Sequence, residues 1–307
     1  METRRGDDHV KSDAYADMIR SAQRRPEFWR VFVILGVGLA VGLFATPLFF
    51  LTLGSADPAL HAITVDPSGQ PRVGVTPGGL FVVLSGFAIL IVVTAMLAER
   101  LTARTLRDIT GPSALMRNDF WVTLKWMIGL LAVMLILPWG VDTQVVDEQY
   151  DIGQWLFWVP FALIGLMVQV LAEELFFRGY LQTQITGATK SYAFGILGSA
   201  FLFGVGHVSP VVDGVAGYFP VVWAICFGVV AGDLTARSGS IGPAVALHLV
   251  NNFAAMMFAP HKDVLSGFGM WVSSADLGAL YSDPLIILHE FLFLAVTWLV
   301  ARVAIRR

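Results

Sequence analysis

Long apolar runs, separated by short polar connections, make up most of this chain. Eight of them are long enough for helices that cross a bilayer, because about 20 apolar residues span its hydrocarbon core. The weaker alternation typical of outer-membrane barrels, in segments of about ten residues, is absent. The pattern predicts eight spanning helices, of which the fifth and seventh are short, at residues 28–53, 79–101, 120–141, 154–181, 192–208, 217–235, 241–258 and 285–305.

Composition supports a membrane protein. Of the 307 residues, 56% are hydrophobic and only 14% are charged, whereas soluble domains carry about 25% charged residues. No basic patch is interleaved with aromatic residues, so nucleic acid is not an expected partner. We expect an all-α integral membrane protein whose first partner is the lipid bilayer.

One membrane domain and one polar segment account for the whole chain. Residues 1–27 carry mixed charges and are interpreted as a cytoplasmic tail. The apolar run that follows is too long for the core of a signal peptide, which spans about 7–15 residues. We therefore expect a single membrane domain over residues 28–307.

Positively charged residues predict the orientation, because cytoplasmic loops hold most of the lysine and arginine. One set of loops and helix ends carries only Arg72 and Lys262. The other set carries the basic residues of the tail, Arg100, Arg104, Arg107, Arg117, Arg178, Lys190, Arg237, Arg302, Arg306 and Arg307. The alternation holds through eight helices, so both termini are predicted to be cytoplasmic, at the plasma (inner) membrane.

Three ionisable residues interrupt the fourth apolar run. Glu173, Glu174 and Arg178 lie within six positions, and one charged residue at a helix centre costs roughly 2.5–3.5 kcal/mol on insertion scales. Glu174 and Arg178 are four residues apart and share a helix face, so they are expected to pair. Glu173 points about 100° away and is left to face something else. The alternative is a structural charge cluster.

Two later helices carry polar residues on one face each. Phe203 and His207 are four residues apart on the fifth helix, and His248 and Asn252 are four residues apart on the seventh. Each set has a plainer interpretation, as hydrogen-bonded packing residues between helices. Intramembrane ionisable residues are nevertheless functional-site candidates by default.

Glu173, His207, His248 and Asn252 suit hydrolysis of a peptide bond if they converge on one pocket. A carboxylate can act as general base for water, and a histidine can share the proton or orient that water. A second histidine and an amide can donate hydrogen bonds to a developing oxyanion. No covalent intermediate is required.

Three motifs together resemble the CAAX protease and bacteriocin-processing family, also called the Abi family, which includes the type II CAAX prenyl endopeptidases. The family motifs E-E-x-x-x-R, F-x-x-x-H and H-x-x-x-N occur here in order, beginning at Glu173, Phe203 and His248. Each motif is weak alone, but the ordered set on separate predicted helices is specific. The resemblance covers about residues 155–258, which form the expected protease-like core.

The resemblance implies a fold, an activity and a role for each residue. The fold would be a bundle of about eight transmembrane helices with an intramembrane polar cavity open to the cytoplasm. The activity would be intramembrane proteolysis of a peptide or protein substrate, prenylated CAAX-type or another membrane-associated peptide. Glu173 and His207 would activate water, His248 and Asn252 would stabilise the oxyanion, and Glu174, Arg178 and Phe203 would support the site. No cofactor is expected.

One feature of the expected boundaries conflicts with this convergence. If the fourth helix ends near Leu181 and the fifth begins near Tyr192, His207 lies roughly 10 Å deeper than Glu173, at about 1.5 Å per residue. A different course or different ends of these helices would remove the gap.

Two alternatives to the metal-independent protease stay open. Glu173, His207 and His248 are a possible metal-ligand set, because two histidines and a carboxylate can bind a transition metal. A transporter, scaffold or immunity protein could also keep the same polar core without catalysis. Transporters often contain inverted repeats, and no internal repeat is evident here.

Overall fold

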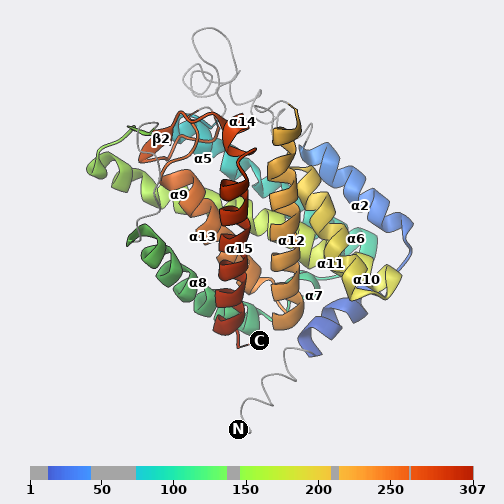
Figure 1. Cartoon of the computed structure of the whole chain (residues 1–307). Coiled ribbons are helices and arrows are strands. Elements are labelled where there is room, and N and C mark those ends of the chain that lie inside the picture. Colours follow the sequence, from blue (N-terminus) through green and yellow to red (C-terminus); the bar gives the residue numbers. More distant parts are fainter. Residues whose placement is uncertain (1–12, 43–73, 137–145, 209–213, 263, 307) are drawn as a thin grey trace.

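The computed structural model describes residues 13–42, 74–136, 146–208, 214–262 and 264–306. These residues are almost entirely helical (Figure 1). The larger helices are α2 (Trp29–Ala40), α5 (Pro77–Gly86), α6 (Ala88–Thr102), α8 (Ser113–Ile136), α9 (Ile152–Glu174), α11 (Tyr192–Val205), α12 (Phe219–Ser238), α13 (Gly242–Met257) and α15 (Pro284–Ala304). The smaller elements are α7 (Leu106–Thr110), the π-helix η3 (Leu175–Gln182), α10 (Thr183–Thr189), the 3-10 turn η4 (Val215–Tyr218), α14 (Leu277–Leu280) and two three-residue strands, β1 (Val146–Glu148) and β2 (Trp271–Ser273).

Five helical stretches in the described ranges are long and apolar enough to cross a membrane. They are Pro77–Thr102, Leu106–Ile136, Ile152–Thr189, Ala216–Ser238 and Pro284–Ala304. Many large apolar side chains on these stretches face outward, as lipid contact requires. The expected fold class, an all-α membrane protein, is confirmed.

Each of the eight predicted segments contains a helix. The fifth and seventh are short, as expected: α11 has 14 residues and α13 has 16. Parts of the first and third predictions, residues 43–53 and 137–141, lie outside the described residues.

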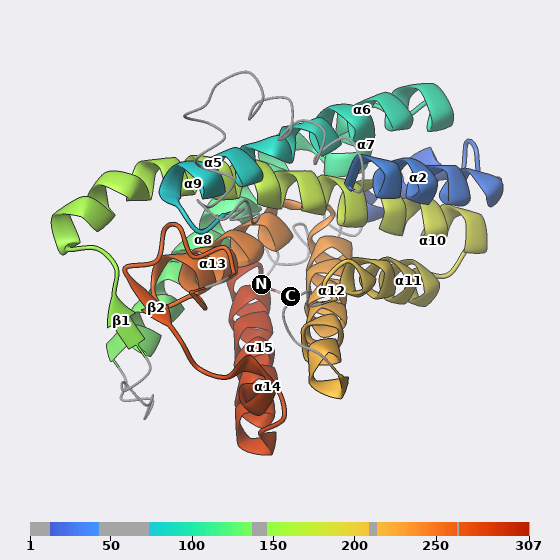
Figure 2. The ribbon, with the colours of Figure 1, turned by 90° about the horizontal axis from the view of Figure 1, so that it is seen from above.

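The helices cross rather than run in one direction. In both views α9 passes at a steep angle to α12 and α15, which lie beside each other (Figures 1 and 2). Strands β1 and β2 pair in antiparallel register, Val146 opposite Ser273, and join the connection before α9 to the one after α13. The central position of α9 places its buried face against both α5 and α13.

The predicted end of the fourth helix, at Leu181, was wrong. The helix continues without a break through η3 and α10 to Thr189. The polar sequence after Leu181 resembles a loop, but its hydroxyl groups bond within the helix: Thr183 donates to the carbonyl of Gly179, and Thr186 donates to that of Gln182. Such bonds satisfy buried hydroxyls without ending a helix.

The longer helix also removes the expected difference in depth between Glu173 and His207. Helix α11 runs back along η3, where the Ser199 hydroxyl donates to the carbonyl of Phe177 at 2.7 Å. The ring of Phe203 packs against that of Phe177, 5.1 Å between centroids. His207 lies four residues beyond Phe203, and Glu173 lies four residues before Phe177. The antiparallel register therefore places both at the same level.

Residues 13–22 form a helix that packs on the end of the membrane domain. The amide of Gln182 donates to the hydroxyl of Tyr15 at 2.9 Å. Arg104, which is 1% exposed, donates to the hydroxyls of Ser21 at 3.0 Å and Thr183 at 2.8 Å. Burial lowers the pKa of Arg104 to about 10, so its guanidinium is still charged at neutral pH. This arginine ties the amino-terminal helix to the helix that carries the glutamates.

Replacing Arg104 is expected to release the amino-terminal helix. Arg104→Met removes several buried hydrogen bonds that hold the amino-terminal helix on the membrane domain. A loss of about 1.4 kcal/mol in the free energy of docking raises the population with this helix undocked tenfold. Chymotrypsin should then cleave near Tyr15 about tenfold faster in purified protein. Arg20→Met is the control, because it removes only an exposed pair with Asp17 on the same helix. Equal cleavage rates in the two variants would contradict the anchoring role of Arg104.

Candidate active site

The two glutamates occupy the end of α9, where the helix changes its winding. Glu173 and Glu174 are the last α-helical residues, and the π-helix η3 begins at Leu175. π-Helical turns are rare in proteins, and those that occur often lie at functional sites. Gly179 within η3 allows close approach of α7, because a Cβ atom there would lie 2.5 Å from the carbonyl oxygen of Ile109.

A buried charge cluster forms around Glu174. Its Oε1 atom accepts from Arg178 Nη1 at 2.9 Å and from His248 Nδ1 at 2.7 Å. The pairing expected between Glu174 and Arg178 is confirmed, with side chains 0% and 1% exposed. The guanidinium also lies over the ring of Phe203, 4.3 Å from its centroid, a favourable arrangement for a cation. Glu174 thus orients His248 as well as neutralising Arg178.

Glu173 approaches the other nitrogen of the same imidazole. Its Oε2 atom is 3.6 Å from His248 Nε2, and the residue is 8% exposed. His248 therefore lies between the two carboxylates.

A second polar contact lies one helical turn away. Asn252 Nδ2 donates to Gln169 Oε1 at 2.9 Å, and Asn252 Oδ1 accepts from Asn251 Nδ2 at 3.2 Å. Gln169 is four residues before Glu173 and shares its helix face. Sequence reasoning missed Gln169, although a buried amide one turn from the key glutamate was the signal that could have indicated it.

His207 lies outside this cluster. It follows the end of α11 in an exposed turn, where its Nδ1 contacts the carbonyl oxygen of Phe203 at 2.8 Å. Its ring lies 4.5 Å from that of Phe203, whose ring in turn lies 6.0 Å from that of His248. No ion pair or hydrogen bond between His207 and Glu173 occurs in the described part of the chain. The structure brings Glu173 beside His248, with Asn252 one turn further along α13, and places His207 beside Phe203.

Three buried polar atoms of the cluster have no hydrogen-bond partner among the described residues. They are Glu173 Oε2, Glu174 Oε2 and Arg178 Nη2. Buried polar atoms are nearly always paired, and exceptions often mark functional sites. Here all three atoms belong to the same cluster, which marks it as a candidate functional site.

The metal alternative requires Glu173, His207 and His248 to converge on one point. Among the described residues, no group of three histidine, cysteine, aspartate or glutamate side chains has an arrangement that could hold a metal ion. His248 Nδ1 contacts Glu174, and the ring of His207 lies beside that of Phe203.

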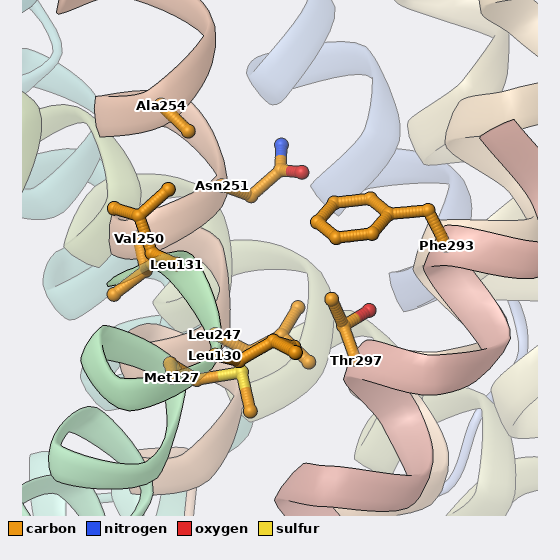
Figure 3. Close-up of a pocket in the computed structure, with 9 residues that line it drawn as sticks. All are labelled: Met127, Leu130, Leu131, Leu247, Val250, Asn251, Ala254, Phe293 and Thr297. Atoms are coloured by element: carbon orange, nitrogen blue, oxygen red, sulfur yellow. The ribbon is translucent and has the colours of Figure 1, made fainter. Parts of the chain in front are cut away.

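Asn251, the residue before Asn252, lines a small, mainly apolar pocket of about 40 Å³. Asn251 points from α13 toward Phe293 of α15 (Figure 3). The pocket is lined by Met127, Leu130, Leu131, Leu247, Val250, Asn251, Ala254, Phe293 and Thr297. It does not include Glu173 or His248, so the polar cavity expected at the site stays a prediction.

Comparison with known proteins agrees with this geometry. Residues 154–254 match the family model described as "Type II CAAX prenyl endopeptidase Rce1-like". We call this matched segment, which is similar to the family, the Rce1-like core. This core, residues 154–254, includes every residue of the site from Gln169 to Asn252, and the match confirms the resemblance to the CAAX protease family.

One curated protein is similar over a longer stretch. The uncharacterized protein YyaK of Bacillus subtilis (strain 168) is 28% identical over 179 residues, which are 53% of this chain and 56% of that protein. The chain therefore spans about half the length of the curated relative it matches. No solved structure matches the chain significantly. The family match, residues 154–254, covers the part of the chain that holds the candidate site.

Breaking the buried charge pair on one side is expected to destabilise the Rce1-like core. Glu174→Gln leaves Arg178 buried without its counter-charge, which typically costs about 3–5 kcal/mol. The double variant Glu174→Gln/Arg178→Met should recover much of that loss, because no unpaired charge is left. Thermal unfolding in detergent micelles, followed by circular dichroism, measures both.

The matched control for this series is Arg237→Met. Arg237 pairs with Asp233 at 2.8 Å, but its side chain is 39% exposed, and exposed pairs contribute about 0–1 kcal/mol. If the double variant unfolds as readily as Glu174→Gln alone, charge imbalance is not what makes the cluster necessary.

Proposed function

We propose that this protein is an intramembrane endopeptidase that hydrolyses peptide bonds with a water molecule activated by Glu173. The observation that carries the proposal is the position of Glu173 Oε2, which is buried, has no hydrogen-bond partner among the described residues and lies 3.6 Å from His248 Nε2. A carboxylate in this position can hold a water molecule and take a proton from it. The match of the core to a peptidase family supports the same activity.

The reaction has two stages. Glu173 takes a proton from water while the water oxygen attacks the carbonyl carbon of the scissile bond. The tetrahedral intermediate then collapses, the C–N bond breaks, and the proton passes to the leaving amine. In this scheme His207, at the level of Glu173, orients the water or shares its proton.

Hydrogen-bond donors on α13 are suited to the developing oxyanion. His248 is held by Glu174 through Nδ1, so its Nε2 atom faces the side of Glu173, and Nε2 can donate to an oxyanion when both ring nitrogens carry protons. Asn252 contributes an amide N–H one turn further along the same face. Donors held in place before the reaction stabilise the transition state without reorganisation. Arg178 and Phe203 keep the site in this shape.

The proposed substrates are peptides or proteins at the membrane, with prenylated CAAX-type peptides as one class. Substrate hydrolysis inside a membrane protein requires that the scissile bond reach a buried carboxylate. A lipid-anchored or membrane-embedded peptide is already concentrated at the bilayer where that carboxylate lies.

We also propose that both termini lie in the cytoplasm, at the plasma (inner) membrane. The basic residues of the chain favour this orientation. The helix of residues 13–22 and the end of α15 lie at the same, lower end of Figure 1, which agrees with it.

Replacing the general base is expected to abolish cleavage without unfolding the protein. Glu173→Gln keeps the size and hydrogen-bonding capacity of the side chain but cannot take a proton from water. Quantitative proteomics of membranes that contain either the wild-type protein or Glu173→Gln should find a membrane protein or peptide that accumulates uncleaved only with the variant. Glu99→Gln, an exposed position on α6, is the control and should cleave normally.

Two results would contradict the proposal. One is full cleavage by Glu173→Gln of a substrate that wild-type protein processes. The other is the absence of any wild-type-dependent product together with a cellular phenotype that Glu173→Gln leaves unchanged, which would favour a transporter or scaffold.

Replacing His207 and replacing His248 are expected to have the same effect on cleavage but different effects on stability. His207→Ala should abolish cleavage with little change in stability, because His207 is exposed and the described interactions of its side chain are with Phe203. His248→Ala should abolish cleavage and also lower the free energy of unfolding by about 1–3 kcal/mol, since buried Glu174 loses a hydrogen-bond donor.

Cleavage rates and thermal unfolding of the purified variants measure these effects. His289→Ala, an exposed histidine outside the Rce1-like core, is the control and should match the wild type in both. Wild-type activity in His207→Ala would remove that residue from the proposed mechanism.

A further inference from the structure

Gln169 and Asn252 form the second of two polar contacts between α9 and α13. Glu173 faces His248, and one turn away Gln169 faces Asn252. The spacing is four residues on each helix, so both contacts lie on the same pair of faces. Gln169 is 6% exposed, which makes it as buried as Glu173 and His248.

The hydrogen bonds of Asn252 determine which way its amide points. A primary amide has a donor end and an acceptor end of nearly identical shape, and its partners decide the orientation. Gln169 Oε1 accepts from the nitrogen end at 2.9 Å, while Asn251 donates to the oxygen end at 3.2 Å. The nitrogen end is thereby held toward α9, the helix that carries Glu173.

The reverse orientation would be unfavourable for catalysis. With its amide turned over, Asn252 would present an oxygen to the site, and an oxygen repels a developing oxyanion. The second N–H of the same nitrogen serves as a donor only in the orientation that Gln169 selects. Without an acceptor at position 169, both orientations of Asn252 become accessible.

From these contacts we propose that Gln169 is a positioning residue, which holds the amide of Asn252 with its N–H groups toward the catalytic carboxylate. This inference rests on the proposed peptidase function. Gln169 acts through Asn252 rather than on the substrate, and nothing in the family motifs described above includes it. Its role is to keep an oxyanion donor in the productive orientation before substrate arrives.

A spectroscopic test does not require a substrate. The chain has three asparagines, Asn118, Asn251 and Asn252, so selective ¹⁵N-asparagine labelling gives three side-chain amide signals in the full-length protein. Asn252→Ala identifies the signal of that residue. Gln169→Met, which keeps the length of the side chain but removes the acceptor, should shift or broaden the Asn252 amide signal and leave that of Asn118 unchanged.

A kinetic cycle tests the consequence for catalysis. The peptide that accumulates with Glu173→Gln provides the substrate. Gln169→Met should lower kcat about tenfold with KM nearly unchanged, less than the 10²–10³-fold typical of deleting an oxyanion donor. In an Asn252→Ala background the same substitution should have no further effect on kcat, because a residue that acts only through Asn252 has nothing left to position.

Gln184→Met is the matched control, a buried glutamine on α10 whose amide donates to the carbonyl of Arg25. It should leave kcat and the Asn252 signal unchanged. If Gln169→Met does not fold, Gln169→Ala replaces it in the same cycle and the same spectra.

The outcomes separate this inference from the peptidase proposal. An unchanged Asn252 amide signal in the Gln169 variant overturns the inference, whatever the enzyme does. The inference is also overturned if Gln169→Met lowers kcat by the same factor in the wild-type protein and in the Asn252→Ala variant. Cleavage that persists in Glu173→Gln overturns the peptidase proposal, while a shifted Asn252 signal would still support the contact between Gln169 and Asn252.

Discussion

The cluster of Glu174, Arg178 and His248 is the interaction on which the site depends. Charges in a low-dielectric interior must be balanced and hydrogen-bonded, or they destabilise the fold by several kcal/mol. Glu174 meets both conditions by accepting from Arg178 in the next turn and from His248 on α13. The ring of Phe203 covers the guanidinium from α11. One carboxylate thus fixes three helices relative to one another.

That arrangement leaves Glu173 with a different environment, although it is the adjacent residue. The helical turn between neighbours directs Glu174 to Arg178 and to one nitrogen of His248, while Glu173 approaches the other nitrogen without a hydrogen bond. The same imidazole therefore contacts a carboxylate that is paired with Arg178 and a second carboxylate that is not. Two carboxylates with separated environments are a frequent basis for acid–base chemistry in enzymes.

Support for the site extends to the end of the long helix. The π-helix and α10 continue the chain beyond the glutamates, and Arg104 and Tyr15 attach the amino-terminal helix to this extension. Arg104 has no carboxylate among its described hydrogen-bond partners, which are hydroxyl and carbonyl oxygens. Burial lowers the pKa of this guanidinium but leaves it charged near neutral pH. The amino-terminal helix is therefore coupled physically to the segment that positions Arg178.

The sequence by itself determined the helices, their approximate places and which of the two adjacent glutamates pairs with Arg178. Apolar runs and a 3.6-residue period are local properties, so the pairing of Glu174 with Arg178 followed from spacing within one helix. Tertiary structure decided what depends on contacts between helices. It extended the fourth helix to Thr189, because buried hydroxyls bonded to carbonyls of the preceding turn. It also placed His248 between both carboxylates and set Gln169 against Asn252. The register of α9 against α13 depends on contacts between the two helices, so it cannot be read from the sequence of either helix alone.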